Sequence, residues 1–278
     1  MSWLRPLGNT GIMVSALGLG TVKLGRDQGV KYPGHFTLPD DASAAALLAQ
    51  ASELGINLLD TAPAYGSSEQ RLGRLLQGRR QDWLICSKVG EEFEQGQSRF
   101  DFSPIHTRAS VERSLRRLNT DVLDIVLVHS DGNDQHIIEN LDTLDTLAQL
   151  KREGLLRTFG MSTKTVSGGL AAAAVCDVVM VAYHPGQRDQ RPVLDACADR
   201  GCGVLIKKAL ASGHLFPAGE EPFPGDPVQA SMNLVFAHPG TSAAIIGTIN
   251  PGHLQANVAA ARRAIAAGFN QSHPDESG

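Results

Sequence analysis

Four side chains of this 278-residue chain could act together as acid–base groups: Asp60, Tyr65, Lys88 and His129. Asp60 ends the short apolar run 57–59, and Tyr65 follows in a loop that contains a proline. Lys88 and His129 end two later apolar runs. Apolar runs bounded by turn residues predict buried strands. These side chains should therefore meet at the carboxyl ends of neighbouring strands, where parallel α/β folds carry their chemistry.

The residue types suit proton transfer to a carbonyl group. A tyrosine has an ordinary pKa of about 10, which is too high for easy proton donation near neutral pH. A nearby ammonium, here Lys88, should stabilise the phenolate and lower the pKa of Tyr65. Asp60 can pair with Lys88 and hold it charged, and His129 can hydrogen-bond and orient a carbonyl. Such a site suits reduction by hydride, which a nicotinamide cofactor must supply because no side chain can.

Eight apolar runs recur along the chain, and a helical pattern follows each of them. The runs end at Gly20, Asp60, Lys88, His129, Ser162, Tyr183, Lys207 and Gly247. A hairpin is expected over residues 3–15, before the first run. One helix is expected across residues 137–150, and a long loop after Lys88. Eight strand–helix units with right-handed crossovers predict an α/β fold, a (β/α)8 TIM barrel with an N-terminal β-hairpin.

A doubly wound open sheet is the alternative fold. It usually carries a glycine-rich fingerprint after its first strand, and residues 18–21 lack the third glycine of that pattern. We therefore predict a single barrel catalytic domain over residues 1–268. Residues 269–278 are polar and are expected to form a flexible C-terminal tail.

Composition restricts the class of protein. A length of 278 residues suits one α/β barrel of about 250 residues. The net charge of −4 comes from 25 basic and 29 acidic residues without a basic block, which argues against nucleic acid as a partner. We see neither a signal peptide nor an apolar run of the ~18 residues that span a membrane, so a cytoplasmic protein is expected. The four cysteines form no Cys-x-x-Cys pair and predict buried thiols, with no metal site.

Several segments resemble the aldo-keto reductase family in their order and spacing. They are Leu17–Thr21, Gly55–Gly66, Ser87–Lys88, Val128–His129 and Gly160–Ser162. The resemblance covers nearly the whole chain. It implies an eight-stranded barrel that binds NADP(H), or sometimes NAD(H), across its rim and interconverts an aldehyde or ketone with its alcohol. It also implies that Asp60, Tyr65, Lys88 and His129 are catalytic, with Tyr65 as the general acid and base.

The same resemblance implies a set of cofactor-binding residues. Ser162 matches a serine that hydrogen-bonds the nicotinamide carboxamide. Thr163 stands where an asparagine is usual, and Met180 where a glutamine is usual. Lys207 replaces a tyrosine that often stacks on the nicotinamide ring; a lysine cannot stack, so ring placement there must differ. The whole set is Gly20, Thr21, Asp60, Ser162, Thr163, Met180, Lys207, Leu210, Ser212, Gly213, Gly247, Thr248, His253 and Asn257.

Residues 247–257 resemble the segment that binds the adenosine end of the cofactor, with a helix N-terminus suited to phosphate. The segment has no Lys or Arg for a 2′-phosphate, and His253 stands where an arginine is common. A mostly neutral imidazole binds a dianion weakly, although Thr248 and Asn250 could donate hydrogen bonds. NADP(H) is the favoured cofactor from the resemblance, and NAD(H) stays possible.

The loops 21–39, 89–105 and 213–226 are expected to set substrate specificity. Aromatic side chains in them could line an apolar pocket. Polar side chains just beyond His129 could favour polar or hydroxylated carbonyl substrates. The aromatic residues are Tyr32, Phe36, Phe93, Phe100, Phe102 and Phe216, and the polar ones are Ser130, Asp131 and Asn133.

Two other functions are compatible with a barrel of this kind. One is an aldolase-type enzyme in which Lys88 forms a Schiff base. The other is a non-catalytic nicotinamide-binding redox sensor. The complete set of four acid–base residues favours the oxidoreductase, because a binding protein needs neither Tyr65 nor His129. The sequence does not indicate the physiological substrate, the direction of reaction or the oligomeric state.

Overall fold

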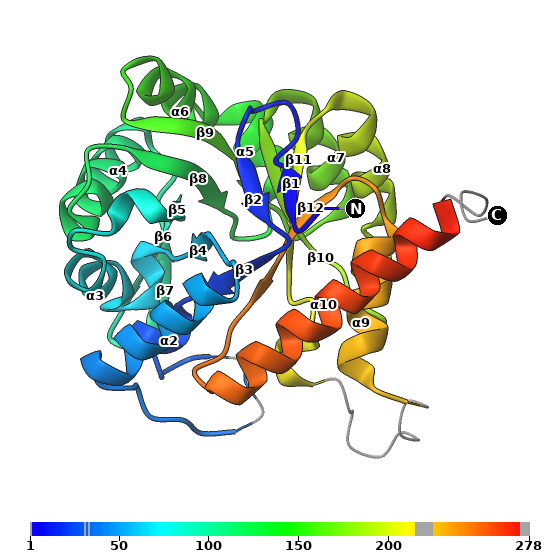
Figure 1. The fold of residues 1–278 in the computed structure, drawn as a ribbon. Helices are drawn as coiled ribbons and strands as arrows, with labels where there is room; N and C mark the ends of the chain where they lie inside the picture. Colours follow the sequence, from blue (N-terminus) through cyan, green and yellow to red (C-terminus); the bar gives the residue numbers. More distant parts are fainter. Residues whose placement is uncertain (1, 31, 33, 215–224, 273–278) are drawn as a thin grey trace.

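The fold is a closed barrel of eight parallel strands (Figure 1). The computed structural model describes residues 2–30, 32, 34–214 and 225–272. The barrel strands are β3 (Leu17–Gly20), β4 (Leu58–Asp60), β5 (Leu84–Val89), β8 (Leu123–His129), β9 (Leu156–Ser162), β10 (Val178–Ala182), β11 (Gly203–Lys207) and β12 (Thr241–Ile246). They pair in this order, and β12 closes the barrel against β3. The (β/α)8 barrel predicted from the sequence is confirmed.

Helices surround the strands as an outer layer (Figure 1). They are α1 (Val22–Gly25), α2 (Asp41–Glu53), α3 (Ser68–Leu75), α4 (Pro104–Leu118), α5 (Asp134–Asn140), α6 (Thr143–Arg152), α7 (Val166–Val175), α8 (Arg191–Arg200), α9 (Pro227–Ala237) and α10 (Pro251–Ser272). Short 3-10 helices lie at η1 (Pro63–Tyr65), η2 (Arg80–Asp82) and η3 (Ala211–Gly213). Side chains of Asp40, Ser103 and Asp226 cap α2, α4 and α9 by accepting backbone N–H groups, which a helix start leaves unpaired.

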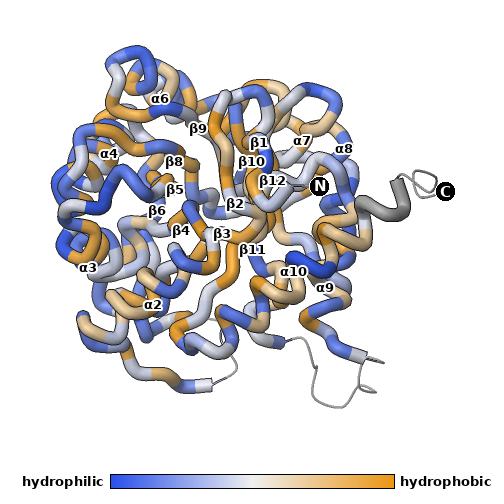
Figure 2. Tube along the Cα trace, in the orientation of Figure 1, coloured by the Kyte–Doolittle hydropathy of each residue, from blue (hydrophilic) through white to orange (hydrophobic). Residues whose placement is uncertain are grey.

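The apolar residues form two cores. Figure 2 shows apolar colouring concentrated on the barrel strands and alternating with polar colouring along the outer helices. One core lies between strands and helices, and the other fills the barrel interior. The N-terminal hairpin, β1 (Leu4–Pro6) and β2 (Met13–Ser15), closes one end of the barrel. Its buried residues Leu7, Ile12 and Val14 join the interior core, as a plug under the strands.

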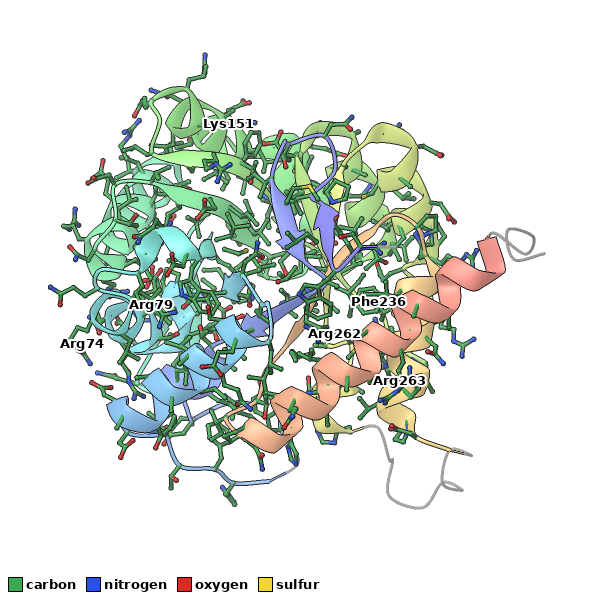
Figure 3. All side chains as sticks on the ribbon, viewed as in Figure 1. Arg74, Arg79, Lys151, Phe236, Arg262 and Arg263 are labelled. Atoms are coloured by element: carbon green, nitrogen blue, oxygen red, sulfur yellow. The ribbon has the colours of Figure 1, made fainter. Side chains whose placement is uncertain are left out.

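Charged side chains occupy the outer layer. Figure 3 labels several arginines on the outer elements. Arg74 pairs with Asp41 at 3.3 Å, and Arg263 donates to Gln229 at 2.7 Å. These two arginines therefore form their contacts on the outer helices. In the described part of the chain, none of the helices is both long and apolar enough to cross a membrane.

Two local predictions differ from the structure. The single helix expected over residues 137–150 is broken at Leu141, which is extended (φ −121°, ψ 144°) between α5 and α6. Its neighbours Asn140 and Asp142 favour turns over helix, and this preference outweighs the apolar spacing. The loop expected after Lys88 contains a second hairpin, β6 (Glu91–Glu94) and β7 (Gln97–Phe100).

The ends of some strands and helices also differ from the predicted ends. Strand β5 continues to Val89, whereas β10 ends at Ala182 and β12 at Ile246, each one residue from the predicted end. Helix α10 continues to Ser272, inside the segment assigned to the tail. Residues 273–278 lie outside the described residues.

Candidate functional site

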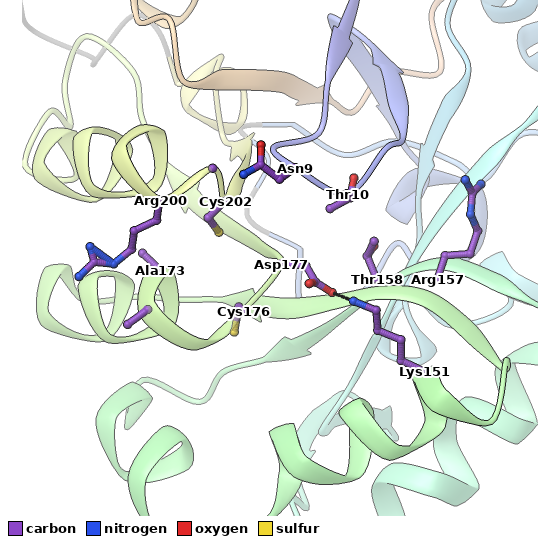
Figure 4. A pocket seen from close by; sticks show the side chains of 12 residues that line it. Asn9, Thr10, Lys151, Arg157, Thr158, Ala173, Cys176, Asp177, Arg200 and Cys202 are labelled. Carbon is purple, nitrogen blue, oxygen red and sulfur yellow. Dashed lines mark hydrogen bonds and ion pairs between the residues drawn. The ribbon is translucent and has the colours of Figure 1, made fainter.

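A cavity of about 600 Å³ opens at the N-terminal end of the barrel (Figure 4). The hairpin turn at Asn9 and Thr10 lines it, together with Asp177 at the start of β10. An ion pair of 2.6 Å between Lys151 and Asp177 lies at this cavity. In barrels of this type the N-terminal face serves stability, and the chemistry lies at the opposite end. The candidate site is therefore the other mouth of the barrel.

At that mouth the four predicted acid–base residues come together. Lys88 Nζ donates to Asp60 Oδ1 at 2.6 Å and to the Thr61 carbonyl at 2.9 Å. Tyr65 Oη lies 3.5 Å from Asp60 Oδ2, and Lys88 Nζ lies 4.8 Å from the centre of the tyrosine ring. The His129 and Tyr65 rings meet edge to face with centres 6.3 Å apart. Asp60 and Lys88 are buried, whereas Tyr65 and His129 are half-buried and can face a substrate.

Short connections after β3 and β4 set the position of Tyr65. The tyrosine ends the 3-10 helix η1, and Gly66 follows with φ +62°. A Cβ at Gly66 would lie 2.2 Å from the Gly25 carbonyl oxygen, so only glycine fits there. Ser68 Oγ hydrogen-bonds the hydroxyls of Thr21 and Thr61 at 2.8 and 3.0 Å, which ties the two connections together. This bridge is the observed role of the buried Ser68 hydroxyl.

The pKa of Lys88 and that of Tyr65 are both shifted at this site, and the shift of Tyr65 differs from the sequence prediction. Burial by itself would lower the pKa of Lys88, but Asp60 outweighs burial and raises that pKa above its ordinary value. Burial raises the pKa of Tyr65, and the charge of Lys88 offsets only part of this increase. The prediction of a lowered Tyr65 pKa is therefore wrong for the protein alone. The phenol keeps its proton, and Lys88 keeps its charge.

A second lysine lies across the mouth from this pair. Lys207, at the end of β11, donates from Nζ to Ser162 Oγ and to the Thr163 carbonyl, each at 2.8 Å. Burial lowers the pKa of Lys207 to about 7, and the charges of Lys208 and Lys88 act in the same direction. Lys207 therefore changes charge near neutral pH, unlike Lys88.

Asp134 holds the loop that follows Ser162, and sequence reasoning missed it. Its Oδ2 accepts from the backbone N–H groups of Lys164 and Thr165 at 2.9 and 2.7 Å, and from the Thr165 hydroxyl at 2.7 Å. Ser130 donates to the other oxygen, Oδ1. Ser130 was expected to add polarity to the pocket, but it is buried and binds Asp134. The only sequence signal was an aspartate at the start of a helix.

Sequence reasoning also missed Glu91, at the start of β6. Its Oε2 lies 2.6 Å from His129 Nδ1. The loop containing Glu91 was predicted to be irregular, so no strand placed this carboxylate over the barrel. Both residues of the hairpin turn, Gln95 and Gly96, have positive φ as a type I′ turn requires, but the sequence carries Gln where Asn or Asp is the usual signal.

Several features of the mouth fit a nicotinamide cofactor. Thr163 Oγ1 is buried and has no hydrogen-bond partner among the described residues, so a ligand group could satisfy it. Lys208, Ala211 and Ser212 have positive φ values of 55°, 47° and 56°. Clusters of such strained residues are typical of ligand clamps, and this one includes Ser212, one of the predicted cofactor-binding residues. A Cβ at Gly247 would lie 2.9 Å from Tyr32 Oη, so a larger residue there would require the Tyr32 side chain to shift.

Other predicted cofactor residues lie differently from the expectation. Met180 is 2% exposed and packs in the interior core, so its side chain offers no polar contact. Asn250 Oδ1 accepts from the N–H groups of Gly252 and His253 at 2.8 and 3.2 Å. Thr248 Oγ1 accepts from Asn250 N at 3.1 Å. Asn250 therefore caps α10, and Thr248 holds Asn250 in place; among these three residues, the exposed His253 is the one whose side chain could meet a phosphate.

The remaining predicted cofactor residues lie near these groups. Gly20 pairs with Asp60 between adjacent strands, and the Thr21 hydroxyl donates to the Asp60 carbonyl at 2.9 Å. Leu210 and Gly213 flank the strained residues of the loop after β11. Asn257 is buried on α10.

The predicted aromatic residues divide by position. Tyr32 and Phe36 meet edge to face at 5.8 Å, and Lys23 Nζ lies 3.8 Å from the Tyr32 ring centre. Burial, with a smaller contribution from Asp60, raises the pKa of Tyr32 to about 12. Phe93 contacts the Arg26 guanidinium, and Phe102 packs against the core between strands and helices. Both rings therefore make contacts within the protein.

The other described residues expected in the substrate pocket contact each other or other parts of the protein. Phe100 stacks on Phe102 with ring centres 6.1 Å apart. Asp131 and Asn133 bond to each other in a turn. Phe216 lies outside the described residues.

Comparisons with known proteins show the family to which the chain is similar. The model of the Aldo/keto reductase family matches residues 16–234. A solved structure described as an aldo-keto reductase from Pseudomonas aeruginosa is 56% identical, with a TM-score of 0.85, and the match covers 94% of this chain and 95% of that one. The L-galactose dehydrogenase of Arabidopsis thaliana is 34% identical over 230 residues, which are 78% of this chain and 68% of that protein.

A relative with a stated cofactor is also similar. The NADH-specific methylglyoxal reductase of Escherichia coli (strain K12) is 29% identical over 226 residues, covering 76% of this chain and 68% of that protein. The matched region includes all four acid–base residues. The chain therefore belongs to the aldo-keto reductase family and is an oxidoreductase that uses a nicotinamide cofactor to interconvert carbonyl compounds and alcohols.

Proposed function

We propose that this protein reduces an aldehyde or ketone with Tyr65 as the proton donor and NADP(H) as the preferred cofactor. The observation that carries the proposal is the buried Lys88–Asp60 ion pair in contact with a half-buried, protonated tyrosine. When bound, a reduced nicotinamide supplies the hydride. The protein must then supply a proton to the carbonyl oxygen, and Tyr65 is placed to do so.

Lys88 and His129 give Tyr65 its role. As hydride reaches the carbonyl carbon, negative charge develops on the oxygen, and Tyr65 donates its proton there. The Lys88 ammonium stabilises the phenolate that remains, because it is buried and Asp60 keeps it charged. His129, whose ring meets the tyrosine ring edge to face, can hydrogen-bond the carbonyl oxygen. The reverse sequence serves alcohol oxidation.

The Schiff-base alternative is poorly supported by the same geometry. A lysine nucleophile must lose its proton before it attacks a carbonyl. Asp60 raises the pKa of Lys88, and the buried ammonium donates two hydrogen bonds. Lys88 is therefore held in the protonated form that cannot attack. Within the part of the chain that the structure describes, no specific contact favours a non-catalytic sensor.

The choice of cofactor can be tested at His253. NADPH and NADH would be titrated separately against the wild type and His253→Arg, with nicotinamide fluorescence as the readout. An arginine beside the α10 N-terminus should tighten NADPH binding about tenfold, or about 1.4 kcal/mol, and leave NADH binding unchanged. Gln255→Arg, which adds the same charge at another exposed position of α10, is the control.

The wild-type result decides the preference itself. Tighter binding of NADH than NADPH would contradict the NADP(H) assignment and would match the NADH-specific relative. The preferred cofactor would then be used to screen aldehydes, ketones and sugars. Binding of a cofactor without turnover of any carbonyl compound would contradict the proposed reaction.

Lys207 should make binding of the oxidised cofactor depend on pH. Because the pKa of Lys207 is about 7, its side chain is charged below neutral pH and neutral above it. A charge next to Ser162 should repel the cationic oxidised nicotinamide and leave the neutral reduced form almost unaffected. We expect the affinity for NADP⁺ to rise roughly tenfold from pH 6 to pH 8. Lys207→Arg should give weak binding and Lys207→Met tight binding at both pH values, and equal pH dependence in all three proteins would contradict the assignment.

A further inference from the structure

Glu91 is an ionised carboxylate held against the outer nitrogen of His129. Its Oε2 lies 2.6 Å from His129 Nδ1, and its side chain is only 12% exposed. Ser98 on the paired strand β7 donates to Oε1 at 2.6 Å, which fixes the carboxylate from the other side. Burial alone would raise the pKa of Glu91, but His129, Ser98 and the Arg26 charge together lower it to about 2. Glu91 is therefore charged at any pH where the enzyme would work.

This contact determines which ring nitrogen of His129 carries the proton. A charged carboxylate oxygen 2.6 Å from Nδ1 disfavours an unprotonated, electron-rich nitrogen at that position and favours an N–H there. The oxygen lies off the line of the ring N–H, so the contact is mainly electrostatic. The negative charge of Glu91 nevertheless favours a proton on Nδ1 over one on Nε2. In neutral His129 the other nitrogen, Nε2, then carries a lone pair and has no partner among the described residues.

We propose that Glu91 is a positioning residue that fixes the Nδ1–H form of His129, so that only the imidazolium can donate from Nε2 to a substrate carbonyl. The inference rests on the proposed function for its consequence. Carbonyl reduction should require protonated His129, because a neutral ring offers the carbonyl oxygen only a lone pair. Alcohol oxidation should use neutral His129, whose Nε2 can accept a hydrogen bond from the alcohol.

The other charged groups around His129 act against its protonation. Burial lowers the pKa of His129 below its ordinary value, and Lys88 on β5 and Lys207 on β11 act in the same direction. Glu91 is the neighbour that opposes them. The ring of Tyr65 meets His129 at its edge. Removing the charge of Glu91 should therefore shift the equilibrium further towards neutral His129.

The tautomer and the pKa can be measured by ¹⁵N NMR of histidine-labelled enzyme, without any substrate. Protonated and unprotonated ring nitrogens differ widely in ¹⁵N shift, and His129→Gln identifies the signals of His129. We expect the Nδ1–H form in the wild type, and in Glu91→Gln a His129 pKa lower by about one unit or more. Glu92→Gln is the control, because Glu92 points to the other face of the strand and pairs with Arg113 and His106.

The pH profile of carbonyl reduction gives the second readout. In the wild type kcat/KM should fall as pH rises through the pKa of His129, and in Glu91→Gln this fall should move to lower pH by the shift that NMR reports. Ser98→Ala keeps the charge but frees Oε1, so it should move the profile in the same direction by less. It also serves as the test if Glu91→Gln does not fold.

Two results would overturn the inference. One is an Nε2–H tautomer of His129 in the wild type. The other is an unchanged His129 pKa in Glu91→Gln, or an equal change in Glu92→Gln. Failure of the proposed reaction would look different, because an enzyme without carbonyl turnover would still give the NMR result.

Discussion

Replacing Tyr65 by phenylalanine is expected to lower kcat for carbonyl reduction by about three orders of magnitude, within the range of general acid catalysis. The change removes one oxygen and leaves the ring that contacts Lys88 and His129. Cofactor affinity should change little, because the contact of the phenol with the expected cofactor residue Asp60 is long, at 3.5 Å, and Lys88 still holds that carboxylate. Steady-state kinetics and fluorescence titration would measure the two effects separately.

A second tyrosine provides the control for this prediction. Tyr32 also lies near Asp60, which contributes to its raised pKa, but Lys88 does not contact it in the way it contacts Tyr65. Tyr32→Phe should therefore retain turnover within about tenfold, well short of the loss expected for an acid. Unchanged turnover together with weakened cofactor binding in Tyr65→Phe would show that the phenol binds and does not donate the proton.

Replacing Lys88 by methionine is expected to destabilise the fold by about 3–5 kcal/mol, the usual cost of breaking a buried ion pair. The mutation leaves the Asp60 carboxylate buried without its 2.6 Å partner and leaves the Thr61 carbonyl without a donor. Urea unfolding followed by circular dichroism would measure the free energy of unfolding. Turnover should be lost as well.

A double substitution separates stability from chemistry at this pair. Asp60→Asn combined with Lys88→Met removes both charges and should recover much of the lost stability. It should not recover turnover, because the phenolate would still lack its cation. Arg74→Met, which breaks an exposed ion pair with Asp41, should cost less than about 1 kcal/mol. Recovery of turnover in the double variant would contradict the role given to Lys88.

The barrel and its four acid–base residues could be predicted because both depend on local patterns. Apolar runs locate the strands, and a residue at a strand end must lie at the barrel mouth whatever the loops do. Asp60, Lys88 and His129 all satisfied this condition. Tyr65 follows a short turn, so its position was constrained by Asp60.

Properties that depend on three-dimensional surroundings could not be predicted in the same way. The direction of the Tyr65 pKa shift was wrong, because the sequence shows a neighbouring cation but not the burial that outweighs it. Glu91 was missed because it depends on a hairpin whose turn, Gln95-Gly96, lacks the usual Asn or Asp. The break at Leu141 was missed because the apolar spacing continues across it.

The bonds of Asp134 divide the barrel rim into a stiff part and an adaptable part. Asp134 joins the segment after β8 to the segment after β9, so the groups at His129 and Ser162 cannot shift independently. Insertions at residues 130–134 or 163–165 should abolish activity. The exposed hairpin tip at Gln95-Gly96 should accept added residues without loss of activity. Evolution, or a library of random insertions, would then find new substrates by remodelling the adaptable part while the stiff part preserves the shared chemistry.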